Sequence, residues 1–410
     1  MDGPEIVARA QALARHSDST QHYTRTYLTA AHQAAAREIG EWMREAGMAV
    51  RTDAIGNVIG RYDGAAPGAK ALLVGSHFDS VRNGGKYDGV LGILLGIACV
   101  GELARRGEKL PVAIEVMAFA DEEGARFQTG MLSSRALVSG FDPGLLDRRD
   151  LQGVTLGDAM RAAGLDPARA GEARIDASRV VAYVEVHIEQ GPVLLNEGKA
   201  LGVVTAIAAG ARHLMTVAGE KGHAGTVPMP MRHDALAAAA EMVLAVERRC
   251  SAGGSLVGTV GILEVKDGTG NVIPGEVKFS VDSRAADGET LAAAQRDVFA
   301  ELDAIAARRG VRLEGNRTHE VRPVPCASGV QDRIAAAIER TAGGGPARRL
   351  PSGAGHDAMI FAEVTDVGMM FVRCGAGGVS HSPAETVSPE DAALAARALL
   401  ALLRSFAAGS

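Results

Sequence analysis

SHFDSVRNGGKYDG, residues 76–89, sets the architecture of this chain. An apolar run, residues 71–75, precedes it, and a longer apolar run, residues 89–101, follows it. This order predicts a buried strand, a glycine-rich loop and the start of a helix. In open parallel α/β sheets ligands bind at the carboxyl ends of strands, where His77, Asp79 and Asp88 are expected to lie.

His77 and Asp79 are two residues apart, so in an extended chain their side chains point the same way. The carboxylate can then hold one imidazole nitrogen while the other nitrogen binds a metal ion. Taken alone, the stretch is equally compatible with a strand-end histidine followed by a helix-capping aspartate at Asp88.

Length and composition favour a globular protein of about two domains that acts on small molecules. The chain has 410 residues, 47% of them apolar, and a net charge of −6, which gives no electrostatic support to nucleic-acid binding. No apolar run is long enough to span a bilayer, and the N-terminus does not resemble a secretory signal. Four scattered cysteines without a CxxC pair are typical of reduced thiols, so we expect a cytoplasmic protein.

Strands and helices alternate through most of the chain, which predicts an α/β domain with a mostly parallel sheet flanked by helices. Helical spacing extends from about Glu5 to Ala46. The further elements expected in this domain are strands at 57–62, 71–77, 112–120, 180–186 and 368–373, and helices at 89–106, from 331 and after 385.

A different pattern between residues 208 and 322 predicts an inserted domain. Strands are expected at 214–217, 257–263, 277–281 and near 311–313, with helices at 234–249 and 291–309, which is a β-α-β-β-α-β order of ferredoxin-like type. Residues 1–207 and 323–410 would then form one discontinuous catalytic domain. Hinges are expected at residues 202–210 and 323–325.

Ligand-type side chains follow several of the predicted strands. One strand ends in His77, a second runs into Glu122 and Glu123, and a third ends in His187. The set His77, Asp88, Glu123, His187 and His381 mixes imidazole with carboxylate, which suits Zn, Mn, Co or Ni. Five protein ligands exceed the need of one open catalytic ion, so we expect two divalent ions bridged by Asp88 and an anionic substrate.

Glu122 and Glu123 diverge in direction because they are consecutive, so one can bind metal while the other acts as general base. An isolated Glu-Glu pair is usually a solvated strand end. Here the pair follows the stretch 112–120, which is apolar except for Glu115, and this favours the functional interpretation.

Eight motifs in order make the sequence resemble the hydantoinase/carbamoylase family of dinuclear-metal amidohydrolases. This family includes allantoate amidohydrolases, N-carbamoyl-L-amino-acid hydrolases and β-ureidopropionases, within a superfamily of aminoacylases and metallo-carboxypeptidases. The motifs are GSHFDS (75–80), GGKYDG (84–89), DEEG (121–124), HIEQGP (187–192), GHAG (222–225), NVIP (271–274), SGAGHD (352–357) and SHSPAE (380–385).

The resemblance implies hydrolysis of the ureido C–N bond of a small carboxylate by a homodimer with an inserted dimerisation or lid domain. It implies that His77, Asp88 and His187 hold one metal ion and that Asp88, Glu123 and His381 hold the other. Glu122 would be the general base and Asp79 would orient His77. The substrate-binding positions implied are Gln190, His223, Asn271, Arg284, Gly355 and His356, with Arg284 gripping the carboxylate. His223 would stabilise the oxyanion at the site of the partner subunit.

Other interpretations stay open for single residues and for the chemistry. Arg284 could be a solvent-facing charge, His223 a turn residue, and His356 a helix cap. An aminoacylase or dipeptidase of the same superfamily is the chief alternative, although His187 followed by EQGP (189–192) resembles the carbamoyl branch. A non-catalytic binding protein is less compatible with the full ligand set. The stretch 352–358 favours allantoate over an N-carbamoyl amino acid.

Overall fold

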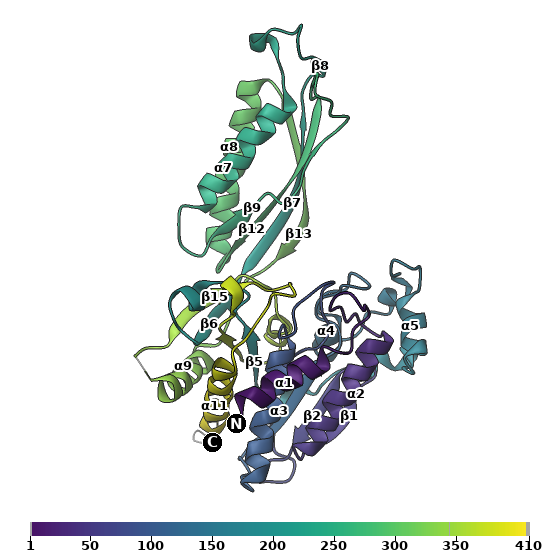
Figure 1. Ribbon diagram of the computed structural model, residues 1–410, viewed down its shortest axis with the longest axis vertical. Helices are drawn as coiled ribbons and strands as arrows, with labels where there is room; N and C mark the ends of the chain where they lie inside the picture. Colours follow the sequence, from purple (N-terminus) through teal and green to yellow (C-terminus); the bar gives the residue numbers. More distant parts are fainter. Residues whose placement is uncertain (1, 344, 407–410) are drawn as a thin grey trace. The chain divides into compact units, whose positions relative to one another are not determined.

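The computed structural model describes residues 2–343 and 345–406, which form two compact units (Figure 1). The first unit is drawn from Met1–Thr205, Cys326–Leu350 and Gly355–Ser410. The second is drawn from Ala206–Pro325 and Pro351–Ala354. The catalytic and dimerisation roles that the sequence predicts for these two parts of the chain stay predictions.

A mixed sheet with strand order β1-β2-β4-β3-β5-β16-β6 forms the centre of the first unit. Its strands are β1 (Ala49–Thr52), β2 (Val58–Tyr62), β3 (Ala71–His77), β4 (Ala113–Phe119), β5 (Val180–Ile188), β6 (Leu201–Ile207) and β16 (Val367–Val372). The neighbours β4, β3, β5 and β16 are parallel, which confirms the predicted α/β class. Two short strands, β14 (Val324–Pro325) and β15 (Arg348–Ser352), pair with β6.

Helices of the first unit pack on this sheet and on one another. They are α1 (Gly3–Leu13), α2 (Ala30–Glu45), α3 (Val90–Arg105), α4 (Leu132–Val138), α5 (Leu156–Ala162), α6 (Val193–Asn196), α9 (Ser328–Ala342), α10 (Ala358–Phe361) and α11 (Pro389–Ser405). α3 contacts β3, β4 and β5, and α1 and α11 also pack against it. Because it is covered on more than one side, α3 is apolar nearly all round.

The prediction of continuous helix from Glu5 to Ala46 is wrong in its middle. α1 ends at Leu13, and residues 14–29 form turns before Thr29 caps α2. The Ser17 hydroxyl accepts a hydrogen bond from a backbone N–H within this segment. Such local side-chain bonds compete with helix formation, which periodicity alone does not reveal.

The second unit pairs an antiparallel sheet with two helices. Its strands are β7 (Ala209–Ala218), β9 (Val257–Thr259), β10 (Leu263–Val265), β12 (Glu276–Ala285) and β13 (Arg312–Val321), and its helices are α7 (Ala235–Cys250) and α8 (Gly288–Arg309). The order β10-β12-β7-β13, with β9 also on β12, fits the predicted β-α-β-β-α-β chain path. The strand predicted at 257–263 is split into β9 and β10, because at Ile262 the backbone N–H bonds to the Ser280 hydroxyl. A separate pair, β8 (Gly222–His223) and β11 (Val272–Ile273), lies beyond this sheet.

The predicted hinge at residues 202–210 is largely strand. β6 extends to Ile207 and β7 begins at Ala209, so only Ala208 lies between them. The stretch contains β-branched residues as well as small ones. The preference of the β-branched residues for strands outweighs the flexibility that the glycines suggest.

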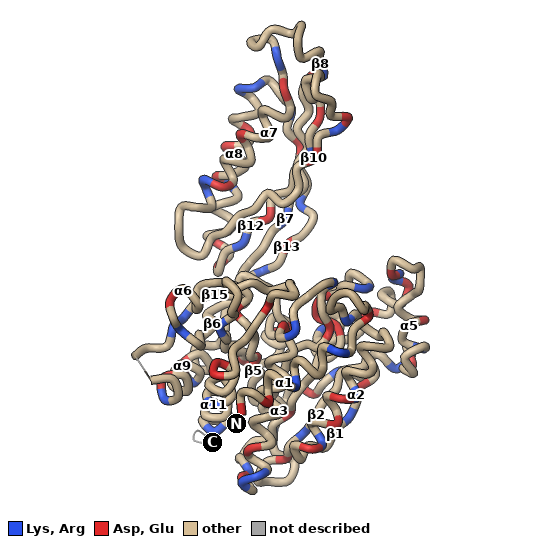
Figure 2. Tube along the Cα trace, viewed as in Figure 1, with Lys and Arg blue, Asp and Glu red and all other residues tan. Residues whose placement is uncertain are grey.

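Charges of both signs are interspersed over α7 and α8 (Figure 2). Ion pairs join the two helices, among them Arg248 with Glu301 at 2.6 Å and Arg249 with Asp297 at 2.8 Å. In the described part of the chain, no helix combines the length and apolar character needed to cross a bilayer.

Candidate metal centre

Three adjacent parallel strands bring the predicted ligands to one edge of the sheet. β3 ends at His77, which is in register with Phe119 at the end of β4, and residues 120–123 follow directly. β5 carries His187 near its carboxyl end. This confirms the expectation that these side chains gather at the carboxyl ends of the strands, because parallel strands end at the same edge of the sheet.

Asp88 lies between two groups of candidate ligands. Its Oδ1 is 3.1 Å from His187 Nε2 and 3.8 Å from His77 Nε2, whereas its Oδ2 is 3.0 Å from His381 Nε2. The His381 Nε2 is also 3.5 Å from Glu123 Oε1. Ligand atoms of His77, Asp88 and His187 fall within 4.8 Å of one another, and so do those of Asp88, Glu123 and His381. One carboxylate therefore faces both triads with different oxygens.

The imidazoles on the two buried strands present the same nitrogen to this cluster. His77 Nδ1 lies 3.2 Å from the carbonyl of Asp79, and His187 Nδ1 lies 2.9 Å from the carbonyl of Ile188. A carbonyl only accepts, so each Nδ1 carries a proton, and Nε2 is the nitrogen that is left to bind a metal ion once it is unprotonated. This tautomer is the one that a metal-binding histidine needs.

Asp79 holds the backbone of the two glutamates. Its Oδ1 accepts from the N–H of Glu122 at 3.0 Å and its Oδ2 from the N–H of Glu123 at 3.1 Å. The Oδ1 also lies 3.4 Å from His77 Nδ1. Asp79 thus contacts both His77, which it was predicted to orient, and the backbone of the predicted base and ligand.

The cluster contains several carboxylates, and burial shields them from water. Burial raises the pKa of Glu122 well above its ordinary value; the charge of His77 opposes this shift and that of Glu123 adds to it. Burial likewise raises the pKa of Glu123 to about 7. Burial alone would also raise the pKa of Asp88, but hydrogen bonds with His187 and His381 hold it well below its ordinary value. A cation among these oxygens would relieve their mutual repulsion.

Two of the predicted ligands or substrate residues have left-handed backbone conformations. Gln190 has φ 57° and His381 has φ 53°. Non-glycine residues are held in this region only where the surroundings require it, commonly at functional sites. The Gln190 Nε2 lies 3.3 Å from each carboxylate oxygen of Asp88 and from His381 Nε2.

Gly355 and His356 lie in the same unit as the candidate metal ligands. His356 is buried, with its ring centroid 4.5 Å from that of His187. Burial and the charge of His187 lower the pKa of His356 well below its ordinary value, so the ring is neutral. A side chain at Gly355 would meet Met131, with a Cβ only 2.7 Å from the Met131 Cε.

His223 and Asn271 lie together in the second unit. β8 and β11 pair His223 with Val272, and the N–H of Ala224 donates to the carbonyl of Asn271 at 3.0 Å. The N–H of Gly225 donates to Nδ1 of His223, so in the neutral ring Nε2 carries the proton and can donate.

Arg284 lies elsewhere in the second unit and is not a simple solvent-facing charge. Its side chain is 39% exposed, and its Nε donates to Asp282 Oδ1 at 3.0 Å. One terminal nitrogen donates to the carbonyl of Gly353 at 2.8 Å. The other terminal nitrogen donates to Asp282 Oδ2 at 3.3 Å, so these bonds hold the guanidinium in a fixed orientation.

The sequence analysis gave no role to three buried carboxylates beside the ligands, namely Glu185, Asp357 and Glu385. Glu185 forms a third possible ligand group with His187 and His356. However, its oxygens already accept hydrogen bonds from the Ser76 hydroxyl, the Tyr183 hydroxyl and the N–H of Ala358. We therefore interpret Glu185 as a residue that stabilises the ends of these strands and not as a metal ligand. Its position two residues before His187 on β5 is the one signal that could have identified it.

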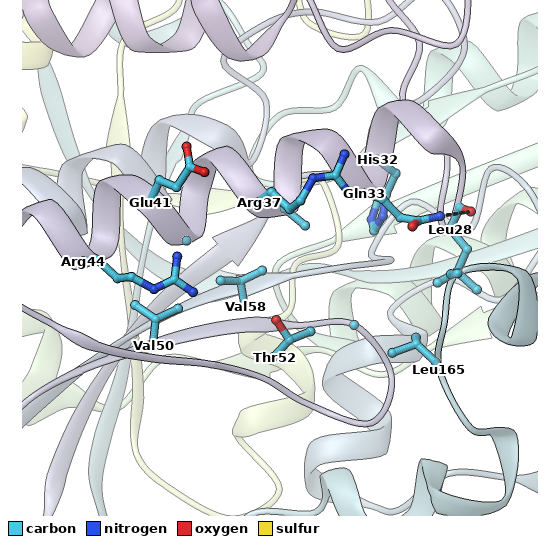
Figure 3. A pocket seen from close by; sticks show the side chains of 14 residues that line it. Leu28, His32, Gln33, Arg37, Glu41, Arg44, Val50, Thr52, Val58 and Leu165 are labelled. Carbon is cyan, nitrogen blue, oxygen red and sulfur yellow. Dashed lines mark hydrogen bonds between the residues drawn. The ribbon is translucent and has the colours of Figure 1, made fainter.

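A cavity of about 390 Å³ lies beside α2, β1 and β2 (Figure 3). Arg37, Glu41 and Arg44 border it, together with the buried ring of His32. None of the predicted metal-binding or substrate-binding residues lines it, so this cavity is separate from the candidate metal ligands.

His32 is expected to make stability depend on pH. Burial lowers its pKa to about 4, although the ring bonds to the carbonyl of Ala120 at 2.7 Å. The folded pKa lies below the unfolded value of about 6.5, so this contribution to stability is full above that pH and is lost as the pH falls towards 4. The loss should reach about 3 kcal/mol.

Urea unfolding of metal-free protein between pH 7 and pH 4 measures this effect. The free energy of unfolding should fall more steeply for the native chain than for His32→Gln, whereas the exposed control His319→Gln should behave like the native chain. Equal pH dependence in the native chain and His32→Gln would contradict this role of His32.

The ends of parallel strands and the loops that follow them gather three imidazoles and several carboxylates, which is the donor set of a divalent metal site. Residues 71–405 match the model of the family described as peptidase family M20/M25/M40. The chain is 44% identical to an N-carbamoyl-L-amino acid amidohydrolase of Geobacillus stearothermophilus, over 92% of this chain and 91% of the relative. It is 40% identical to allantoate deiminase 1 of Glycine max, over 98% of this chain and 89% of the relative.

A solved structure supports the same assignment. The crystal structure of a hydantoinase/carbamoylase family amidase from Burkholderia multivorans superposes with a TM-score of 0.92 and 33% identity, covering 99% of this chain and 98% of that one. The chain therefore belongs to peptidase family M20/M25/M40 and, within it, to the hydantoinase/carbamoylase family. This confirms the resemblance and the prediction of an amidohydrolase that acts on C–N bonds other than peptide bonds.

Proposed function

We propose that this protein hydrolyses the ureido C–N bond of a small carboxylate, either allantoate or an N-carbamoyl-L-amino acid, with two divalent ions per chain. The observation that carries the proposal is the position of Asp88, whose two oxygens face two different ligand triads. The functions for which the relatives are named, those of an N-carbamoyl-L-amino acid amidohydrolase and of allantoate deiminases, support this substrate class.

The residues present fit a pair of Zn, Mn, Co or Ni ions. His77, Asp88 and His187 would hold one ion, and Asp88, Glu123 and His381 would hold the other. The Nε2 lone pairs of His77 and His187 are directed by the hydrogen bonds at their Nδ1 atoms, and nitrogen with carboxylate oxygen is the donor set that these metals prefer. When bound, such ions supply Lewis acidity for the attack of water on a carbonyl.

Glu122 is the proposed general base. It lies three residues after the end of β4, its backbone is held by Asp79, and burial raises its pKa. A raised pKa brings the carboxylate closer to the operating pH, where it can take a proton from the attacking water and return it to the departing nitrogen. The bond that breaks joins the carbonyl carbon to the nitrogen that leaves as ammonia.

The remaining predicted residues would bind the substrate. In the first unit these are Gln190, Gly355 and His356, which lie around the ligands already described. In the second unit Arg284 would bind the substrate carboxylate bidentately. We propose that the second unit acts as a dimerisation and lid domain, which would bring these groups to the reacting centre.

His223 would act in the partner subunit of a homodimer. Arg284 lies near one end of β12, whereas the other end pairs with Ala218 before the chain continues to His223. Eight residue steps separate Glu276 from Arg284, about 27 Å of extended strand. β8 lies beyond that strand, at the tip of the unit (Figure 1). A small substrate held by Arg284 cannot also reach His223 of the same chain, which supports action in trans.

Mixing two inactive variants tests the action in trans. Glu122→Gln and His223→Ala, unfolded and refolded together, form heterodimers in which one of the two sites has both residues intact. Because half of randomly assembled dimers are heterodimers, the mixture should recover about a quarter of native activity. No recovery, with heterodimers demonstrated by mass spectrometry, would place His223 at the site of its own chain.

The substrate class is tested by a panel of compounds. The chelator-stripped protein, reloaded with Mn, Zn, Co or Ni, is offered allantoate, N-carbamoyl-L-amino acids, N-carbamoyl-β-alanine, an N-acetyl amino acid and a dipeptide. Ammonia release from allantoate or an N-carbamoyl-L-amino acid, with the higher kcat/KM naming the branch, is the expected result. Cleavage of only the dipeptide or the N-acetyl compound would overturn the ureido assignment in favour of the peptidase alternative.

A cytoplasmic location is proposed from the thiols. All four cysteines lie in the described part of the chain, where they are buried and form no disulfide, at positions far apart in the sequence. Secreted proteins of this size commonly use disulfides, so four reduced cysteines favour a reducing compartment.

A further inference from the structure

We propose that Glu385 is a positioning residue that joins the loop carrying Asp88 to the loop carrying His381, and thereby fixes the geometry in which both metal ions bind. The inference rests on the proposed two-metal function and assigns Glu385 a part in it. Glu385 is not a member of either ligand triad built on Asp88.

The Glu385 carboxylate binds both loops at once. Its Oε1 accepts hydrogen bonds from the backbone N–H of Tyr87 at 2.8 Å and of Asp88 at 3.1 Å. Its Oε2 accepts from the hydroxyl of Ser380 at 2.8 Å. Asp88 is the shared ligand and Ser380 directly precedes His381, so one side chain ties the two ligands together across nearly 300 positions of sequence.

Burial makes these contacts difficult to replace with water. Glu385 is only 2% exposed, so its loss would leave two backbone N–H groups without a partner in the interior. The backbone at Asp88 would then be held only on its carbonyl side, where Tyr87 and Asp88 accept from the N–H groups of Leu91 and Val90, and it could shift. A ligand whose backbone shifts no longer holds its carboxylate between the two triads.

The loop itself is built to receive this carboxylate. A Cβ at Gly85 would fall 2.1 Å from the Glu385 carboxyl carbon and 2.2 Å from each of its oxygens. Every other residue at position 85 would therefore displace Glu385. Gly85 has no left-handed backbone angle, so its role is close approach and not conformational freedom.

Metal affinity distinguishes a positioning role from other roles. In Glu385→Gln the amide oxygen can accept from both N–H groups and the amide nitrogen can donate to the Ser380 oxygen, so the contacts survive without the charge. Glu385→Ala removes all three contacts. Gly85→Ala displaces the carboxylate from the other side. Glu390→Ala, an exposed change nearby in sequence, is the matched control.

The experiment is calorimetric titration of chelator-stripped variants with Mn²⁺ alone. Glu385→Ala and Gly85→Ala should each weaken metal binding about 10- to 100-fold, whereas Glu385→Gln and Glu390→Ala should stay within about 3-fold of the native chain. Combining Gly85→Ala with Glu385→Ala should cost little more than either change alone, because both break the same contact.

Other outcomes would overturn the inference. Native metal affinity in Glu385→Ala, equal losses in the Gln and Ala variants, or fully additive losses in the double variant would each show that Glu385 does not act by joining the loops. Urea unfolding in chelator identifies any variant that fails to fold, and Gly85→Ala and Glu385→Gln then carry the test. The metal titration contains no substrate. A failure to hydrolyse ureido compounds in the separate assay would therefore count against the proposed function without changing the outcome of the titration.

Discussion

Replacing Glu122 with glutamine is expected to lower kcat by about 10³- to 10⁴-fold while metal content stays native. Glutamine has nearly the same shape but cannot accept the proton of the attacking water or return it to the leaving nitrogen. The Asp79 contact that places Glu122 is to its backbone N–H, so the substitution does not disturb it. The measurement is steady-state ammonia release together with elemental analysis of the purified variant.

Two outcomes would contradict the role of Glu122. Near-native turnover in Glu122→Gln would assign the proton transfer to another group. Loss of metal together with activity would make Glu122 a ligand, since its carboxylate lies within 4.8 Å of the ligand atoms of His77 and Glu123. Glu123→Gln is the matched comparison, because it should lose metal first and activity as a consequence.

Replacing Asp88 with alanine is expected to abolish activity and to reduce bound metal from the proposed two ions per chain to about one or none. Asp88 is the one residue common to both triads, and it is also the carboxylate whose pKa the surrounding histidines hold low. Without it, His187 and His381 have no shared anion between them. The loss should therefore exceed that of any single outer ligand.

Asp88→Asn separates charge from shape in this prediction. The amide keeps one oxygen but not two anionic ones, so it should retain at most one ion and little turnover. His187→Ala is the comparison, because it removes a ligand from one triad only. Two tightly bound ions in Asp88→Ala would contradict the bridging arrangement.

Much of the fold of the first unit could be predicted because its strands are buried on both faces. β3, β4, β5 and β16 are nearly continuous apolar runs, which is the pattern of a parallel sheet. β1 and β13 were missed or shortened because most of their residues are exposed at a sheet edge, so they lack an apolar signal. The turns at residues 14–29 depend on polar side chains that helical periodicity ignores.

His77, Glu123 and His187 could be predicted because each lies at or just after the end of a strand that the sequence predicts, whereas Asp88 and His381 lie in the loops that follow β3 and β16. The topology then brings His77, Glu123 and His187 together without further information. Glu385 could not be found in this way. It follows no strand directly, and its contact with Gly85 depends on how two loops pack, which no local pattern encodes.

The residues of the second unit mark a further limit of sequence reasoning. Spacing gives no reason to place His223 beside Asn271 or to separate both from Arg284, since all three lie in polar stretches. The antiparallel register of β12 with β7 separates them, because it runs the whole length of the sheet. That separation supports the proposal that His223 acts at the site of a partner chain.

The central claim is that two ions held by the Asp88 cluster enable hydrolysis of a ureido C–N bond. Its most direct test is a titration of chelator-stripped protein with Mn²⁺ or Zn²⁺, following ammonia release from allantoate and an N-carbamoyl-L-amino acid beside a dipeptide control. Ammonia release should be absent without metal, rise with added ion and level off near about two equivalents per chain. Ureido compounds that stay intact at every metal level, while the dipeptide is cleaved, would contradict the account.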